Sequence, residues 1–153
     1  MTRLVAFEDL AEGAVFWGEE VVVDANAMVD YARQYDPWPF HVDVEAAKQT
    51  AFGGLVASGG YTFSLWCRSV HTIYYRTPDL EWAFLGGYDL RVKLLQPVRP
   101  GDRLRLKVSI GAKRPSTKPG RGHVDSVHVL MRHDAVPVFS VEFGFLMATR
   151  DSV

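Results

Sequence analysis

The segment Tyr61–Tyr75, with the sequence YTFSLWCRSVHTIYY, contains no glycine, proline or aspartate. Apolar side chains recur along it at the spacing of an α-helix. One helical stripe consists of Phe63, Trp66, Cys67, Val70 and Tyr74, and other faces carry Tyr61, Leu65 and Ile73. A helix that is apolar on most of its sides is normally buried. We therefore predict a long central helix from about Gly59 to Tyr75.

Beyond this segment the hydrophobic period changes from 3.6 to 2 residues. Between Asp102 and Ile110, aliphatic residues alternate with charged or polar ones, which is typical of a strand with one solvent-facing side. The same alternation marks three further segments: Leu90–Leu94, Val127–Met131 and Phe139–Met147. Two turn sequences lie near the ends of these strands: Pro100-Gly101 and His133–Ala135.

The N-terminal third of the chain predicts one strand and two helices. Val15–Val23 is rich in β-branched residues, which favours a strand. Asp24 can cap a helix, and its apolar residues follow helical spacing: Met28, Tyr31, Ala32 and Tyr35. Asp43 can cap a short helix over Val44–Gln49. The order of elements predicts an α+β fold, with an antiparallel sheet wrapped around the long central helix, in a single domain over residues 1–153.

Composition and charge exclude several classes of protein. The 153 residues are 48% hydrophobic and 23% charged, as in an ordinary globular domain. A net charge of −1 offers no general attraction to nucleic acid or to anionic membranes. The first ten residues lack the apolar core of a signal peptide, and no apolar run approaches the roughly 18 residues of a membrane span. The single cysteine, Cys67, is expected to be a buried hydrophobe in a cytoplasmic protein.

The segment Tyr35–Asp43, YDPWPFHVD, places an aspartate and a histidine five residues apart across two prolines. Proline fixes φ and removes a backbone donor, so we expect a rigid, non-helical loop here. A rigid loop is a good support for two groups that must converge on one small molecule. The spacing permits Asp36 and His41 to converge but does not require it.

This segment resembles the signature of the MaoC-like hydratases and dehydratases. In that signature four residues separate an aspartate from a histidine, and one more separates the histidine from a second aspartate. The matching residues are Asp36, Pro39, His41 and Asp43. Phe52–Gly60, FGGLVASGG, resembles the family's glycine-rich entry to its central helix, and Gln96–Asp102, QPVRPGD, resembles its turn between two strands.

The chain departs from the family pattern at two positions. Trp38 stands where the family often has asparagine, and Ser58 stands where many members have histidine before the glycine of the oxyanion site. Trp38 either lines the substrate channel or packs against its neighbours. Ser58 either caps the central helix or binds the substrate.

The resemblance implies a hotdog fold and the reversible hydration of trans-2-enoyl thioesters to (R)-3-hydroxyacyl thioesters. Asp36 and His41 are the implied acid–base pair, with one water held between them; a histidine, whose ordinary pKa is about 6.5, suits proton transfer in either direction. The backbone N–H of Gly59 is expected to stabilise the thioester oxygen, because the first turn of a helix presents N–H groups and a positive dipole end. The expected substrate-binding residues are Trp38, Ser58 and Gly60.

The same reasoning gives expectations about cofactors and partners. His41 and Asp43 have the spacing of two metal ligands, but no third ligand follows at a useful distance. We predict no metal and no redox cofactor, with coenzyme A as part of the substrate. The expected partner is an acyl-CoA thioester, or one on an acyl carrier protein, with no nucleic acid and no membrane. We also expect a homodimer or higher homo-oligomer, because sheet edges favour pairing.

Two other functions stay open at this point: a thioesterase on the same fold, and a non-catalytic subunit that binds acyl thioesters. The basic segment Lys113–Arg121 carries four cations and no acid. It is either a solvated hairpin or a contact for the phosphates of coenzyme A, across a subunit boundary. Four other histidines fit no motif: His71, His123, His128 and His133.

Overall fold

The computed structural model describes residues 2–75 and 79–153; residue 1 and residues 76–78, which belong to the predicted domain, lie outside the described residues. The strands are β1 (Arg3–Val5), β2 (Val15–Val22), β3 (Leu80–Trp82), β4 (Phe84–Leu94), β5 (Arg103–Pro115), β6 (Arg121–Arg132) and β7 (Pro137–Ala148). The α-helices are α1 (Ala25–Tyr35), α2 (Pro39–Val42), α3 (Val44–Lys48) and α4 (Gly59–Tyr74). Short 3₁₀ turns cover Phe7–Asp9 and Arg150–Ser152.

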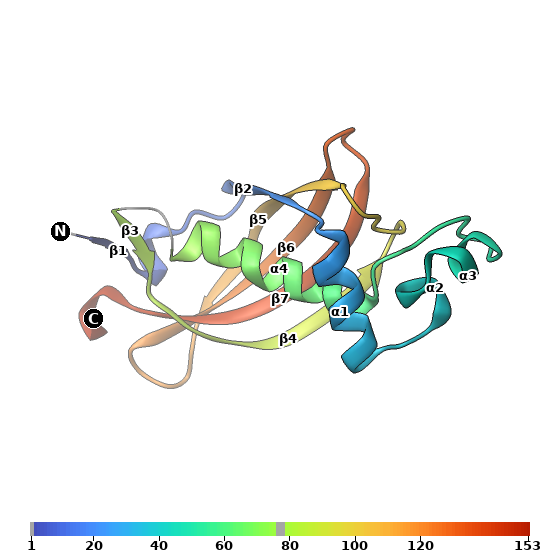
Figure 1. Cartoon of the computed structure of the whole chain (residues 1–153). Helices are drawn as coiled ribbons and strands as arrows, with labels where there is room; N and C mark the ends of the chain where they lie inside the picture. The colour runs from blue at the N-terminus through green and yellow to red at the C-terminus, as the bar shows by residue number, and fades with distance from the viewer. Residues whose placement is uncertain (1, 76–78) are drawn as a thin grey trace.

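One five-stranded antiparallel sheet dominates the fold, with the strand order β2-β5-β6-β7-β4. The strands β1 and β3 pair in parallel in a small second sheet. Figure 1 shows α4 lying along one face of the large sheet, with α1, α2 and α3 gathered at one end. This arrangement confirms the predicted α+β fold with a sheet around a central helix. That the chain forms a single domain stays a prediction.

The alternating pattern of the sequence places the core. In β5, Leu104, Leu106 and Val108 are fully buried, whereas Arg103 and Arg105 point outward and are exposed. Large side chains from β7 continue the same buried layer: Phe139, Val141, Phe145 and Met147. From α4, Leu65 and Ile73 close the core against the sheet. None of the described helices is long and apolar enough to span a bilayer.

The long helix α4 has the predicted bounds, but one of its faces is less buried than predicted. Phe63, Cys67 and Val70 are only partly buried, while Trp66 and Tyr74 from the same stripe lie in the core. Cys67 is therefore half-buried rather than enclosed, and partial burial raises the pKa of its thiol. Two polar residues are fully buried here: Ser69 within the helix, and Ser58 directly before it.

The two edge strands of the large sheet differ. In β2 the register shifts between Trp17 and Glu20, which marks a bulge. At this bulge the N–H of Glu19 donates to Oγ1 of Thr72 in α4, at 3.1 Å. Gly18 lets β2 approach α4 here, because a Cβ at this position would lie 2.7 Å from Thr72 Oγ1.

The opposite edge, β4, has register shifts near its start, between Phe84 and Gly86 and between Gly87 and Asp89, but it pairs regularly with β7 from there to Leu94. Its side chains are exposed nearly throughout. The sequence pattern predicts that Leu90 and Val92 lie on one buried side, but they are 44% and 40% exposed. The prediction is wrong because β4 is an edge strand. It has a neighbouring strand, β7, on one flank only, so its side chains have fewer neighbours to bury them.

The segment between α1 and α3 also differs from the prediction. Pro39–Val42 forms the short helix α2 rather than a non-helical loop. Pro39 occupies the first helical turn, where its missing N–H costs nothing and its fixed φ already suits a helix. Asp43 then ends α2 and caps α3, as predicted, by accepting hydrogen bonds from the N–H groups of Glu45 and Ala46.

Candidate active site

Asp36 is positioned by the end of α1. Asp24 caps the start of that helix by accepting from the N–H of Ala27 at 2.7 Å. At the other end, the N–H of Asp36 donates to the carbonyl of Ala32 at 2.8 Å. Pro37 follows and cannot continue the helix. The position of the Asp36 carboxylate is therefore set by the C-terminal end of α1. Its side chain is 40% exposed.

His41 lies on α2 and is 7% exposed. Its Nδ1 is 2.7 Å from the carbonyl oxygen of Val56. A carbonyl oxygen can only accept a hydrogen bond. Nδ1 therefore carries the ring proton and donates a hydrogen bond to Val56. In the neutral ring the other nitrogen, Nε2, then keeps its lone pair. Nε2 faces Oδ2 of Asp36 at 3.6 Å, which is longer than a direct hydrogen bond.

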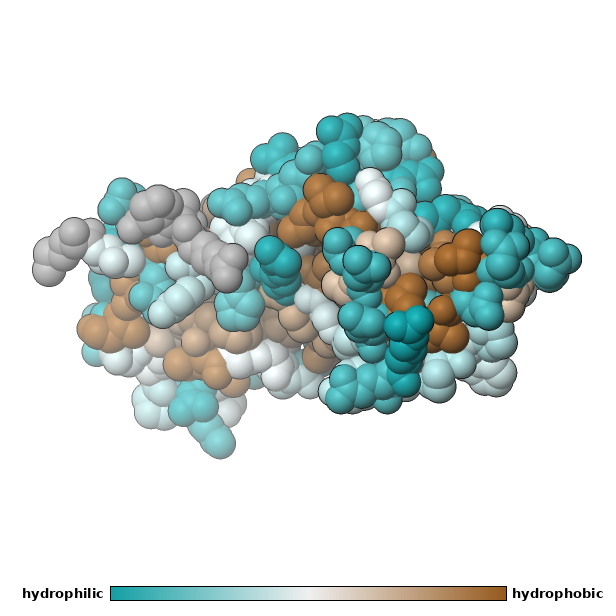
Figure 2. Space-filling view, viewed as in Figure 1, coloured by the Kyte–Doolittle hydropathy of each residue, from teal (hydrophilic) through white to brown (hydrophobic). Residues whose placement is uncertain are grey.

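Both side chains line a cavity of about 570 Å³. Its walls also include the segment Leu94–Val98, the first turn of α4 and aromatic residues from the α2 region. Trp38 and Phe40 stack in parallel with ring centroids 6.1 Å apart, and Phe52 packs on Phe40 at 5.3 Å. Trp38 is thus both a packing partner and part of the cavity wall. In Figure 2 apolar patches interrupt the hydrophilic surface at the end of the molecule where α2 lies.

The first turn of α4 borders the same cavity through Gly59 and Gly60. A Cβ at Gly59 would lie 3.3 Å from Leu94, another residue of the cavity wall. Gly60 also has a packing role, because a Cβ there would lie 2.7 Å from the hydroxyl oxygen of Tyr31. Helices α1 and α4 therefore approach each other closely at Gly60. This close packing keeps Asp36, at the end of α1, beside the same cavity as the start of α4.

Ser58 is the N-cap of α4, and its Oγ accepts from the N–H of Tyr61 at 3.1 Å. The residue is fully buried. Ser58 thus has the structural role that its position before a helix predicts. A contact between Ser58 and the substrate stays a prediction.

A second buried histidine lies outside this cavity. His128 in β6 is fully buried, and its Nδ1 accepts from the indole N–H of Trp66 at 3.0 Å. Its Nε2 therefore carries the proton and donates to Oγ of Ser126 at 2.9 Å, and that hydroxyl donates to the carbonyl of Phe143. Burial lowers the pKa of His128 to about 3.

Residues 11–130 match the model of the MaoC like domain. The solved MaoC-like dehydratase from Rhodospirillum rubrum is 30% identical, with a TM-score of 0.86, and the match covers 95% of this chain and 98% of that one. This chain belongs to the MaoC-like dehydratase family. It is also 27% identical to the uncharacterized protein YdeM of Bacillus subtilis (strain 168), over 92% of this chain and 96% of that protein.

The hotdog architecture of this MaoC-like chain recurs in more distant structures. R-hydratase PhaJ1 from Pseudomonas aeruginosa superposes with a TM-score of 0.71 at 19% identity, over 94% of this chain and 85% of that one. At this identity the likeness concerns the fold.

The structure gathers most of the predicted site residues of this MaoC-like protein around one cavity. Asp36, His41, Gly59, Gly60 and Trp38 all line it. Sequence reasoning missed the opposite wall, Leu94–Val98. This segment follows a strand whose alternation is typical of core packing, and its leucines carry no signal that separates a cavity wall from an interior. Arg99 was missed as well; it donates through Nη2 to the carbonyl of Phe52 at 2.6 Å and so ties the two walls together.

Proposed function

We propose that this protein catalyses the reversible hydration of trans-2-enoyl thioesters to (R)-3-hydroxyacyl thioesters. The observation that carries the proposal is the placement of His41. Its Nδ1 is committed to Val56, and its Nε2 faces Asp36 at 3.6 Å inside a cavity that the start of α4 borders. Two acceptors at that separation are too far apart for a direct bond and can both accept hydrogen bonds from one water.

In the proposed reaction, Nε2 of His41 accepts a proton from the water as the water oxygen bonds to C3 of the substrate. The electron pair of the C2–C3 double bond moves towards the thioester carbonyl, whose oxygen faces the N–H of Gly59. The Asp36–His41 pair then returns a proton to C2, so that one water is added in total. Acid–base help of this kind contributes about 10²- to 10⁴-fold, and an oxyanion donor about 3–4 kcal/mol.

The proposed reaction moves protons and adds water, and it changes no oxidation state of a cofactor. We therefore keep the prediction that the protein needs neither a metal nor a redox cofactor. The substrate in this proposal is an acyl thioester, with coenzyme A as its simplest carrier.

We further propose a homodimer formed along β4. This strand presents apolar side chains along an unpaired edge, and the exposed ones are Phe84, Leu85, Tyr88, Leu90, Val92 and Leu94. Leu94 and Leu95 also line the candidate cavity. A partner strand on β4 would therefore cover apolar surface and close one side of the site at the same time.

The proposed dimer also bears on the basic hairpin between β5 and β6, which begins near Lys113 and ends near Arg121. It would bring this hairpin towards the cavity of the partner protomer. The hairpin lies at the end of the sheet away from α2 (Figure 1). If two β4 strands pair in antiparallel fashion, this end of one protomer faces the cavity end of the other. A contact of the hairpin with coenzyme A phosphates across the subunit boundary stays a prediction.

A product assay tests the proposed reaction. The full chain is incubated with crotonyl-CoA while enoyl absorbance and free thiol are followed together. We expect enoyl absorbance to fall without release of thiol, and Asp36→Asn to remove this activity. Asp43→Asn is the matched control, because asparagine keeps the side-chain oxygen that caps α3. Release of thiol would show a thioesterase instead, and binding of crotonyl-CoA without turnover would show a non-catalytic subunit.

A further inference from the structure

The proton position on His41 depends on a single peptide plane. The carbonyl of Val56 accepts from Nδ1 of His41 at 2.7 Å. The N–H of the same planar peptide unit belongs to Ala57, and it donates to the carbonyl of Val98 at 2.8 Å. Rotation of this plane would break both hydrogen bonds together. The bond to Val56 leaves the lone pair of Nε2 facing Asp36, so the proposed base depends on the position of this plane.

This peptide plane lies in a segment that forms neither helix nor strand. Residues 52–57, which we call the Val56 segment, lie between α3 and α4. Two glycines stand near its start, and Gly53 has a φ of +66°, so the backbone is least restricted there. Closer to the plane, the N–H of Val56 donates to the carbonyl of Phe40 at 3.1 Å. The path of the segment is therefore fixed by hydrogen bonds to other parts of the chain.

Arg99 holds the start of the Val56 segment. Its Nη2 donates to the carbonyl of Phe52 at 2.6 Å, across 47 residues of sequence. The guanidinium also lies beside Gly54, because a Cβ on that glycine would be 3.5 Å from Nη1. A hydrogen bond from a charged donor is stronger than one between neutral groups. The arginine thus restrains the end of the segment where the glycines leave the backbone free.

Arg99 is itself fixed by a tight turn. Its N–H donates to Oδ2 of Asp102 at 2.9 Å, and the N–H of Asp102 donates to the carbonyl of Arg99 at 3.1 Å. Val98, the preceding residue, is 3% exposed and supplies the acceptor for Ala57. Two consecutive residues of this turn region therefore bind the two ends of the Val56 segment.

We propose that Arg99 is a positioning residue, which holds the Val56 segment so that the Val56 carbonyl stays on Nδ1 of His41. This inference rests on the proposed function, because it concerns the base of that reaction. A neutral imidazole can carry its proton on either nitrogen, and the hydrogen-bond partner decides which. Without the bond to Phe52, the segment is free to turn the Val56 carbonyl away from the ring. His41 then populates the form with its proton on Nε2, and in that form Nε2 cannot accept a proton from water.

The test uses the full chain with Arg99→Met, which keeps the aliphatic stem and removes the donors. Steady-state rates with crotonyl-CoA give kcat and KM, and NMR of the isotope-labelled ring nitrogens gives the proton position on His41. We expect kcat to fall by about tenfold, since small displacements of catalytic groups have effects of this order, and KM to change by less than about threefold. The Nδ1–H form of the wild type should give way to a mixture of both forms. Arg99→Lys, whose ammonium can still donate, should recover part of kcat.

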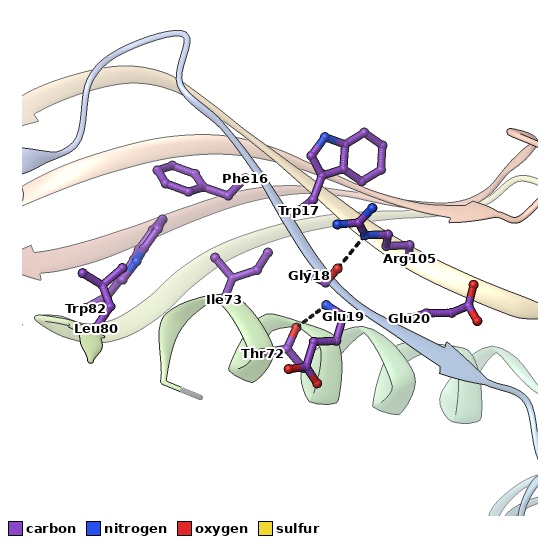
Figure 3. Close-up of a pocket in the computed structure, with 10 residues that line it drawn as sticks. All are labelled: Phe16, Trp17, Gly18, Glu19, Glu20, Thr72, Ile73, Leu80, Trp82 and Arg105. Carbon is purple, nitrogen blue, oxygen red and sulfur yellow. Dashed lines mark hydrogen bonds between the residues drawn. The ribbon is translucent and has the colours of Figure 1, made fainter. Parts of the chain in front are cut away.

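Arg105→Met is the matched control. Arg105 also donates to a backbone carbonyl, that of Gly18 at 2.7 Å, at the bulge in β2; Figure 3 draws this bond as a dashed line. Neither Arg105 nor Gly18 lines the candidate cavity. We expect this variant to keep the kcat and the ring-nitrogen spectrum of the wild type.

Three results would overturn the proposal: a wild-type His41 with its proton on Nε2, an unchanged Nδ1–H form in Arg99→Met, or equal losses of kcat in Arg99→Met and Arg105→Met. If Arg99→Met does not fold, Arg99→Gln serves the same test, because its amide nitrogen ends two bonds short of Nη2. Absence of turnover in the wild type would contradict the proposed function, while the ring-nitrogen spectra would still decide whether Arg99 positions Val56.

Discussion

His41 and His128 are both buried, yet their surroundings leave them different chemistry. Each has a partner that fixes the position of its ring proton: Val56 fixes it on Nδ1 of His41, and Trp66 fixes it on Nε2 of His128. The two histidines differ in the surroundings of the other ring nitrogen, Nε2 in both residues. In His128 it donates to Ser126, whereas in His41 it faces Asp36 across 3.6 Å in a cavity.

This comparison shows that burial alone does not identify a functional histidine. His128 is deeper than His41, and its pKa is lowered to about 3, yet no nitrogen of its ring has a lone pair or proton to spare. A strongly perturbed pKa often marks a functional site, and structural networks produce such shifts as well. The uncommitted lone pair of His41 is the stronger indication of catalysis.

The largest expected effect is on activity at His41. His41→Ala should lower kcat/KM by about 10²- to 10⁴-fold, because it removes the proposed base for the attacking water. His128→Asn should change kcat/KM little, because the amide oxygen can still accept from the indole N–H of Trp66 and the position lies outside the candidate cavity. Steady-state rates with crotonyl-CoA, corrected for the folded fraction, compare the two variants. Equal losses in both would remove the distinction between the two histidines.

The second effect is on stability at His128. His128→Ala leaves the buried indole N–H of Trp66 without its acceptor and creates a cavity beside Phe143. We expect the free energy of unfolding to fall by about 3 kcal/mol, since an unpaired buried donor costs about 1–3 kcal/mol and a cavity adds to it. Urea denaturation measures this change, with His128→Asn as the milder reference. If the free energy of unfolding fell by no more than about 0.5 kcal/mol, as for an ordinary surface substitution, the result would contradict a stabilising role for the hydrogen bonds among Trp66, His128 and Ser126.

The third effect concerns pH. Burial lowers the pKa of His128 from 6.5 to about 3 in the folded state. Between these values the unfolded chain binds a proton that the folded chain excludes. The stability contributed by neutral His128 is therefore present above about pH 6.5, and it is lost as pH falls towards 3, at up to about 1.4 kcal/mol per unit. Urea titrations across this range should show a shallower dependence for His128→Asn, and equal slopes would speak against this assignment.

The smallest effect is expected at Ser58, a buried hydroxyl next to the cavity whose oxygen is already used as a helix cap. Ser58→Ala should lower the free energy of unfolding by about 1 kcal/mol and leave KM for crotonyl-CoA unchanged. Ser58→Gly should lower the stability by only a few tenths of a kcal/mol, because glycine is a better N-cap than alanine and fits the fully buried position. A raised KM in both variants would show that Ser58 also binds the substrate.

Much of the fold follows from local patterns in the sequence. The 3.6-residue period of α4, the alternation in β5 and β7, and the caps at Asp24 and Asp43 each act over a few residues, so the sequence displays them directly. The helix α2 was missed because Pro39 has two opposite meanings: it interrupts a helix internally and initiates one at the first turn. The sequence also indicated the wrong exposure for β4, since periodicity cannot tell an edge strand from a central one.

The candidate site was predicted in part. The resemblance of Tyr35–Asp43 to the family signature marked Asp36 and His41, and the resemblance of the glycine-rich segment Phe52–Gly60 marked the start of α4. Contacts between distant segments left no local signal, such as Trp66 with His128 at a separation of 62 residues, or Arg99 with Phe52 at 47. The proton position on His41 also depends on such a contact, because Val56 lies fifteen residues further along the chain.

The bulge in β2 has a consequence for how many copies of the chain can join. The backbone N–H of Glu19 is turned inward to Thr72, and the carbonyl of Gly18 is occupied by Arg105, so part of this border no longer offers hydrogen-bonding groups to an incoming strand. The β2 edge is therefore less suited to pairing with another copy than a regular edge strand. In the dimer proposed along β4, a bulged β2 strand would lie at each outer edge of the combined sheet, which disfavours the addition of further copies.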